Sequence, residues 1–328
     1  MASPKSISVA MCTFNGQRFL GQQLASIASQ SRPPTEVIIR DDCSTDSTVE
    51  IINRFVATAP FPVKLTINEK NLGSLPKGIT RNFELATLQC SGQLIAPCDQ
   101  DDIWFPSKLS RMAEILENDD NLGGVLSDAQ LVNEDGKPTG GLLSEARNLT
   151  RGDQRRLRSG EALPILLGTS KTYGCTIMFD ARLVGKLFPV PEHWWFDEWL
   201  GCAVSALSRL EFHPEPLISY RVHPAQSHGP RRLTMFDRLQ AWTKPATAAL
   251  ELEELQLAEF CVRMESQNDS HSKQNLDFVS GRLNLLRKRL ELPRNHLLRA
   301  KRILPEIRNY CRYFNGWRSI IKDLTVSI

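Results

Sequence analysis

Hydrophobic and polar positions in the first hundred residues switch repeatedly between the two-residue period of a strand and the longer period of a helix. The stretch SISVAMCTF at 6–14 is rich in β-forming residues, and QRFLGQQLASIASQ at 17–30 then places apolar side chains at helical spacing. The same order recurs, with strands predicted at 34–42, 63–68 and 92–99 and helices at 44–58 and 75–89. Strands that alternate with helices predict a parallel sheet joined by right-handed crossovers.

The pattern after residue 106 predicts further elements and then a change of character. We expect a helix at 107–119, a strand with a turn at 123–137, a strand and helix at 171–187, a helix at 194–208 and closing strands at 209–224. The polar and basic stretch 144–160 is expected to be a mobile loop over the sheet's ligand-binding edge. From Leu233 onward the spacing is helical. The sequence therefore predicts two regions, at 1–228 and 229–328.

Three polar loops follow predicted strands: CTFNG, RDDCSTD and CDQDD. Ligands of such sheets bind beyond the carboxyl ends of the strands, so we expect these loops to meet at one crevice. Asp99, Asp101 and Asp102 crowd three carboxylates into four residues, and their repulsion calls for a cation such as Mg²⁺ or Mn²⁺. Asp99 and Asp101 should point to one side, with Asp102 bracing the loop. A purely solvated acidic loop is the alternative.

The other two loops are suited to a nucleotide. Asp41 and Asp42 end a strand, where a carboxylate can accept hydrogen bonds from a base imide or a ribose hydroxyl. Cys12, Thr13 and Phe14 offer backbone groups for a base edge and an aromatic face for stacking. The alternative for each of them is an ordinary strand-end turn.

Composition then narrows the class of protein. Hydrophobic residues at 41% and charged residues at 23% are ordinary globular values, which argues against a disordered or membrane-embedded chain. The first residues, MASPKSISVAMCTFNG, hold too short an apolar run for us to expect a signal peptide or a spanning helix. The eight cysteines are scattered without a CxxC pair, so we expect reduced thiols in a cytoplasmic compartment.

Charge is distributed unevenly along the chain. Twelve Lys or Arg against three acidic residues give 282–328 a net charge of +9, which leaves −6 for the rest of a chain whose total is +3. Apolar residues from Ile307 to Leu324 recur at helical spacing beside this charge. Such a stripe packs on the protein itself or lies on an anionic membrane surface, and nucleic acid is the weaker partner for it.

Four segments in order, VAMCTFNGQRFL, VIIRDDCSTDST, NEKNLGSLPKGITRNFELA and LIAPCDQDDIWFPSKL, resemble glycosyltransferase family 2. This resemblance implies the glycosyltransferase A fold, an α/β fold with a Rossmann-like mixed sheet flanked by helices, here with a helical C-terminal extension. DQDDIW followed by P-x-KL resembles the rhamnosyltransferase-like branch, which uses dTDP-L-rhamnose. The resemblance covers roughly the first two thirds of the chain.

The resemblance also implies roles for particular residues. A nucleotide-sugar donor would be bound by Asp42 with Asp41, by Asn71 and Gly73 of the NLG segment, by Arg81 with Asn82, and by Asp99. Asp99 and Asp101 would hold the metal ion with the nucleotide. In the family's closing segment a His can reach the metal or the diphosphate, which would be His223, although a structural His is the commoner case.

The segment WWFDEWL supplies the group that the transfer still requires, a base for the acceptor hydroxyl. The resemblance places Asp197 in that role, with Phe196 and Glu198 standing where rhamnosyltransferase-like members have His and Trp. Tryptophans around Asp197 would raise its pKa and improve it as a base. Glu198 is the alternative base. Gly174, Trp195 and Trp199 are expected at the acceptor site, with Glu198 beside them.

The predicted activity is an inverting transfer of a sugar to a saccharide or a lipid-linked saccharide. Lipid-linked acceptors would bring the basic C-terminal helices to the inner face of the membrane. Two rival functions remain. A sugar-1-phosphate nucleotidyltransferase should open with a Gly-rich basic loop, which CTFNGQRFL lacks. A non-catalytic nucleotide-sugar-binding or scaffold protein would keep the fold without the chemistry.

Overall fold

The computed structural model describes residues 3–73, 76–167, 172–224, 226, 247–267 and 270–326. The chain divides into two compact units, Met1–Pro230 and Arg231–Ile328. The boundary expected at 228/229 and the helical prediction for 233–246 lie outside the described residues.

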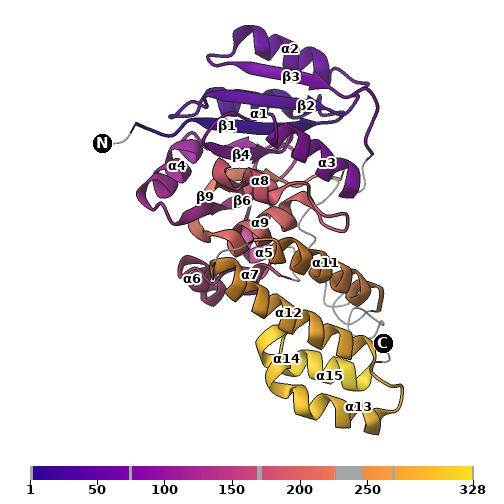
Figure 1. The fold of residues 1–328 in the computed structure, drawn as a ribbon. Coiled ribbons are helices and arrows are strands. Elements are labelled where there is room, and N and C mark those ends of the chain that lie inside the picture. Colours follow the sequence, from indigo (N-terminus) through magenta and orange to yellow (C-terminus); the bar gives the residue numbers. More distant parts are fainter. Residues whose placement is uncertain are drawn as a thin grey trace. The chain divides into compact units, whose positions relative to one another are not determined.

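One mixed sheet runs through the first unit, and its nine described strands follow the order β3-β2-β1-β4-β8-β6-β9-β5, with β7 paired to β6 (Figure 1). The first four strands are parallel, which confirms the expectation from the first hundred residues. Beyond them β8 is antiparallel to both β4 and β6, so the sheet is mixed, as the resemblance implied. The strands are β1 Ile7–Thr13, β2 Glu36–Asp41, β3 Val63–Ile67, β4 Leu94–Cys98, β5 Ile103–Trp104, β6 Leu122–Val132, β7 Pro138–Leu142, β8 Ile177–Asp180 and β9 Arg209–Arg221.

Helices connect these strands where apolar residues recur at helical spacing. In α1 the buried side chains include Leu20, Leu24 and Ile27, one face of the helix. These pack with strand residues such as Val9 and Ile39 in one core that is almost fully closed to water. The helices of this unit are α1 Leu20–Ala28, α2 Thr48–Thr58, α3 Pro76–Thr87, α4 Lys108–Asn118, α5 Leu143–Ala146, α6 Arg151–Arg158, α7 Ala162–Leu166, α8 Val184–Leu187 and α9 Phe196–Leu207.

The loop expected at 144–160 is wrong, because this stretch forms α5 and α6. Thr150 caps α6: its hydroxyl accepts from the N–H of Asp153 at 3.1 Å, and the Asp153 carboxylate accepts from the N–H of Thr150 at 3.1 Å. Leu157 then buries its side chain almost completely. The reciprocal cap and the buried side chains of Leu149 and Leu157 account for the order of a stretch whose composition is otherwise polar.

The second unit is helical: α11 Thr247–Glu265, α12 Ser270–Leu290, α13 His296–Ile303, α14 Ile307–Tyr313 and α15 Trp317–Thr325. The apolar stripe from Ile307 to Leu324 is split, because Gly316 adopts a positive φ of 53° between α14 and α15. Tyr310 and Ile320 are buried in this unit's own core, whereas the Trp317 side chain is 63% exposed. In the described parts of the chain, each helix is too short or too polar to span a lipid bilayer.

Part of the positive charge in this second unit is internal. The Arg289 guanidinium donates to both carboxylate oxygens of Asp323, at 2.7 and 3.0 Å, and Tyr310 donates its hydroxyl to the same carboxylate at 2.6 Å. Arg299 is fully buried and donates to the carbonyl of Asp323 at 2.9 Å. These arginines hold the helices together, so they do not contribute to a basic outer surface.

Candidate active site

The short strand β5 fixes the position of the acidic loop. Ile103 pairs with Ser219 in the antiparallel ladder between β5 and β9, and continuing this register brings residues 101 and 102 beside Arg221. The Arg221 N–H donates to Asp102 Oδ1 at 3.0 Å, and its Nε donates to the Asp101 carbonyl at 2.7 Å. His223 Nε2 lies 3.0 Å from Asp101 Oδ2. The acids that follow β4 are therefore held against the end of β9.

The Arg221 guanidinium is a fixed cation beneath this loop. It is fully buried, and it donates to the Glu134 carbonyl at 2.5 Å and to Gln22 Oε1 at 2.6 Å. Its Cζ lies 4.6 Å from the centroid of the Phe19 ring. Each of the three guanidinium nitrogens thus donates at least one hydrogen bond, and the charge offsets part of the repulsion among the neighbouring aspartates.

The candidate metal ligands are arranged differently from the expected set of Asp99, Asp101 and His223. In the part of the chain that the structure describes, the three residues whose ligand atoms all lie within 4.8 Å of one another are Asp99, Asp102 and Cys175. Asp102 and Cys175 are buried, and burial raises the pKa of both well above their ordinary values. Mg²⁺ and Mn²⁺ prefer oxygen ligands to a thiol. Asp102 is better suited to the bracing role that its bond from Arg221 indicates.

A buried lysine lies next to these acids. Lys108, at the start of α4, donates from Nζ to the Cys175 carbonyl at 2.8 Å and sits 3.8 Å from the centroid of the Trp104 ring. Burial lowers its pKa to about 8, while the nearby charges of Asp102 and Asp99 act in the opposite direction. Its charge helps to offset those of Asp102 and Asp99.

Gln100 joins the acidic loop to the loop after β1. The Phe14 N–H donates to Gln100 Oε1 at 2.9 Å, and Gln100 Nε2 donates to the Phe14 carbonyl at 2.9 Å. The Phe14 ring is 43% exposed, which leaves an aromatic face free for stacking. Cys12 and Thr13 line the same hollow. Two loops that are distant in sequence are thus fixed to each other at the expected nucleotide end.

The two acids that end β2 have different environments. Asp42 lines the crevice, and its carboxylate accepts from the Leu72 N–H and from Asn68 Nδ2, both at 2.8 Å. Asp41 is fully buried and is not among the lining residues, because its carboxylate accepts from the Thr13 hydroxyl at 2.8 Å and from the Ser44 N–H at 2.8 Å. Asp42 therefore lines the crevice, whereas Asp41 orders the loop after β2 through these hydrogen bonds.

Three other residues expected at the donor do not line the crevice. Asn71 donates from Nδ2 to the Asp42 carbonyl at 2.8 Å, and Gly73 has a φ of +98°, a turn conformation that favours glycine. Arg81 is 50% exposed and pairs with Glu84 one turn along α3. Asn82, its neighbour, does line the crevice.

One crevice of about 540 Å³ gathers most of the expected residues. That volume falls in the usual range for a small-molecule site. Its lining includes the expected residues Cys12, Thr13, Phe14, Asp42, Asp99, Asp101, Gly174, Trp195, Asp197, Glu198 and His223. Nucleotide, metal and acceptor groups that were expected from separate segments therefore share one hollow.

Asp197 lies at the start of α9 and lines the part of this crevice where the acceptor was expected. Its half-buried carboxylate accepts from the Glu198 N–H at 2.9 Å. Removal from water is the main cause that raises its pKa to about 7, followed by the charge of Glu198 and that of Asp99. A carboxyl group with that pKa can both accept and release a proton near neutrality.

The acceptor residues expected around Asp197 divide into two groups. Trp195, which precedes α9, is half-buried and lines the crevice, as do Glu198 and Gly174. Trp199 does not reach it: the side chain is fully buried, and its indole Nε1 donates to the Leu187 carbonyl at 2.8 Å. Trp199 therefore belongs to the packing of α9, not to the acceptor surface. A Cβ added at Gly174 would meet only ordinary contacts, the nearest at 3.8 Å.

Sequence reasoning missed several residues of the site. No role was expected for Gln100, and charged side chains such as those of Lys108 and Arg221 are expected at the surface unless a sequence signal indicates otherwise. Arg147 lines the crevice from a stretch that was predicted to be a loop, and Tyr173 lines it beside Gly174. The sequence shows Lys108 two positions after Pro106, but no feature of the sequence indicates that this lysine is buried.

A comparison with protein-family models matches residues 8–175 to "Glycosyl transferase family 2". The matched segment makes up half of the 328 residues, and the chain belongs to glycosyltransferase family 2. This confirms the resemblance inferred from the four segments.

Two curated relatives illustrate how far the sequence similarity extends. An uncharacterized glycosyltransferase of Nostoc sp. is 26% identical over 231 residues, which is 68% of this chain and 66% of that protein. RfbG of Shigella flexneri, named a dTDP-rhamnosyl transferase, is 30% identical over 106 residues, 32% of this chain and 36% of its own length. The chain thus spans less than two thirds of either relative.

Solved structures share the fold at low sequence identity. TarS residues 1–349 of S. aureus, in complex with UDP-GlcNAc, has a TM-score of 0.58 and 15% identity over 96% of this chain and 90% of that one. The mannosyltransferase PcManGT of Pyrobaculum calidifontis, in complex with GDP-Man and Mn²⁺, has a TM-score of 0.53 and 16% identity. The match covers 98% of this chain and 79% of that one. These likenesses confirm the glycosyltransferase A fold.

Proposed function

We propose that this protein transfers a sugar from a nucleoside-diphosphate sugar to an acceptor hydroxyl with inversion at the anomeric carbon. The observation that supports this best is the shared crevice, in which Asp197, with a pKa of about 7, lies in the same hollow as Asp99, Asp101 and His223. A base at one end and acids suited to a cation at the other are the two groups that such a transfer needs.

A divalent cation, Mg²⁺ or Mn²⁺, fits the donor set at this crevice. Asp99 and Asp101 offer carboxylate oxygens. Burial and, after it, the charge of Asp101 raise the pKa of Asp99 to about 7, so a cation here would relieve the repulsion between the two acids. The second ring nitrogen of His223, Nδ1, is buried with no hydrogen-bond partner among the described residues. When bound, the cation would neutralise charge on the leaving diphosphate.

The protein's own groups would carry out the remaining steps. Phe14 and Asp42 would bind the nucleoside, the first by stacking and the second through hydrogen bonds. The acceptor oxygen would attack the anomeric carbon from the Asp197 side, the bond to the diphosphate oxygen would break, and Asp197 Oδ would take the hydroxyl proton. Trp195 would shield the reacting sugar from water.

Donor and acceptor identity are finer parts of this proposal. The relative RfbG and the DQDDIW segment favour dTDP-L-rhamnose as the donor. The acceptor would be a saccharide or a lipid-linked saccharide in cell-surface polysaccharide synthesis. Residues 1–228 would carry the catalysis, and the basic helices of 229–328 would meet the inner face of the membrane from the cytoplasm.

The experiment that tests the proposal measures release of nucleoside diphosphate and transfer of the sugar with Mn²⁺ present. Asp197→Asn should abolish both and keep the thermal shift produced by the nucleotide, because only the base is lost. Full activity in that variant would refute the base assignment. A non-catalytic scaffold protein would bind the nucleotide and give no release with any acceptor.

A further inference from the structure

The cations that line the crevice differ in how they are paired. Six carboxylates line it, from Asp42, Asp46, Asp99, Asp101, Asp197 and Glu198, against the cationic groups of Arg18 and Arg147 and the imidazole of His223. Arg18 pairs with Glu134, and His223 lies 3.0 Å from Asp101. Within the described ranges, Arg147 has no carboxylate partner, although it is half-buried in a strongly acidic crevice.

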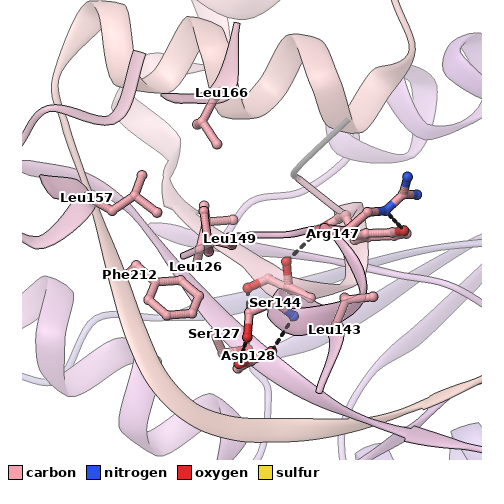
Figure 2. A pocket seen from close by; sticks show the side chains of 12 residues that line it. Leu126, Ser127, Asp128, Leu143, Ser144, Arg147, Leu149, Leu157, Leu166 and Phe212 are labelled. Carbon is pink, nitrogen blue, oxygen red and sulfur yellow. Dashed lines mark hydrogen bonds between the residues drawn. The ribbon is translucent and has the colours of Figure 1, made fainter. Parts of the chain in front are cut away.

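Arg147 is held in a defined place and orientation. It follows α5, whose start is fixed by the buried Asp128, which accepts from the Ser144 N–H at 3.1 Å and from its hydroxyl at 2.5 Å. The Arg147 Nε donates to the Tyr173 hydroxyl, and its Cζ lies 4.6 Å from that ring's centroid. Figure 2 shows the guanidinium directed away from Asp128 and from the apolar side chains of Leu149, Leu157 and Phe212.

The small hollow that Arg147 also lines has no room for an anionic ligand. The hollow drawn in Figure 2, lined by Asp128, Leu126, Phe212 and others, has a volume of about 20 Å³, which is room for a single water molecule. Of the two hollows that Arg147 lines, the large crevice is therefore the one with room for a ligand, and Tyr173 lines it as well.

Tyr173 adds a second donor at the same place. Its hydroxyl accepts from Arg147 Nε and so keeps its own proton available to donate. Burial raises the pKa of Tyr173 to about 12, and the Asp197 carboxylate contributes to this rise, so the hydroxyl stays protonated near the proposed base. Tyr173 also directly precedes Gly174, which lines the acceptor end.

We propose that Arg147, oriented by Tyr173, binds an anionic group on the acceptor, a phosphoryl or a carboxylate group, and thereby selects charged acceptors over neutral ones. The inference rests on the proposed transfer function and specifies the acceptor class of that same site. A guanidinium fork matches either anion through two parallel hydrogen bonds. The surrounding carboxylates would repel such an acceptor if the arginine were absent.

The test compares three probes that share a sugar: a neutral hexoside, the hexose 1-phosphate and the corresponding hexuronate. Binding to the full-length protein saturated with nucleoside diphosphate and Mn²⁺ is measured by calorimetry. We expect at least one anionic probe to bind about tenfold more tightly than the neutral one, because a hydrogen bond between charged groups changes affinity by about that factor. Arg147→Met should remove this preference. Tyr173→Phe should reduce the preference partly.

Controls separate this inference from its rivals. Arg151→Gln removes an exposed arginine on α6 that does not line the crevice, and it should leave the preference unchanged. If Arg147→Met instead weakens nucleoside diphosphate binding, the arginine serves the donor and the inference is wrong. Equal binding of charged and neutral probes to the unaltered protein would also refute it. Absence of sugar transfer by the unaltered protein, with the binding preference intact, would refute the proposed function alone.

Discussion

The imidazole Nε2 of His223 lies 3.0 Å from Asp101 Oδ2, which joins the chain after β9 to the acidic loop after β4. The Phe19 ring covers the imidazole at a centroid distance of 4.7 Å. A metal ion bound by Asp101 would therefore find a second ligand already in position. The antiparallel ladder between β5 and β9, continued, puts residue 101 opposite Arg221, two positions before His223.

Replacing His223 with Gln should weaken Mn²⁺ binding in the presence of a nucleoside diphosphate by at least about tenfold, because even outer partners of metal ligands have effects of that size. Calorimetric titration of Mn²⁺ measures the change. His213→Gln is the matched control, since His213 pairs with Glu215 and does not line the crevice. If His223→Gln binds Mn²⁺ as the unaltered protein does, His223 has only a structural role.

The pH dependence of transfer should follow the ionisation of Asp197. Its pKa is raised to about 7, so the carboxylate is protonated below that pH and cannot accept the hydroxyl proton. We expect kcat/KM to fall about tenfold for each pH unit below 7. Glu198→Gln removes the charge that ranks second among the causes raising this pKa, so the acid limb should move to lower pH. An acid limb that stays in place in Glu198→Gln would mean that another group controls the rate.

Gln100→Ala should loosen the nucleotide end of the crevice. It removes both hydrogen bonds with the Phe14 backbone, each worth about 1 kcal/mol. We expect nucleoside diphosphate to bind about five- to tenfold more weakly in a titration. Gly16→Ala should give the same result by another route, because its Cβ would lie 2.2 Å from Gln100 Oε1. Different outcomes for the two variants would show that the Gln100 contacts do not order this loop.

Lys108→Met should lower stability because it removes a charged donor from a buried position. The hydrogen bond to the Cys175 carbonyl is lost, and a bond to a charged group contributes about 1.5–3 kcal/mol. The change in the free energy of unfolding is measured from the first transition in urea denaturation. Lys64→Met, at an exposed position on β3, should stay within about 0.5 kcal/mol. If both variants are equally stable, the buried ammonium makes no net contribution.

The sequence predicts those parts of this site that depend on local periodicity. Strands β1, β2 and β4 end where their apolar runs end, so the carboxyl-end loops with Phe14, Asp42 and Asp99 could be placed together in advance. The pairing of β5 with β9 is a long-range contact without a local signal, and it brings Arg221 and His223 to the acids. The burial of a charged side chain cannot be predicted from the sequence either, because no local pattern distinguishes the buried Lys108 from an exposed lysine.

The last prediction concerns the helices of the second unit. The described residues of α13 and α15 expose Leu297 and Trp317, at 78% and 63%, on a region rich in lysine and arginine. Exposed apolar side chains among cations are typical of helices that lie on anionic membranes. The full-length protein should therefore sediment with vesicles containing anionic lipid and much less with zwitterionic ones, and added salt should weaken the binding.

Trp317→Ser should reduce this sedimentation several-fold without loss of helix content, because the side chain lies outside this unit's core of Tyr310 and Ile320. The matched control is Val262→Ser on α11, where an apolar side chain is 69% exposed outside the basic 282–328 segment. Equal sedimentation of both variants and the unaltered protein would show that the exposed tryptophan does not contact the bilayer. Arg289 and Arg299 are buried within the unit, so the remaining lysines and arginines would have to supply the attraction.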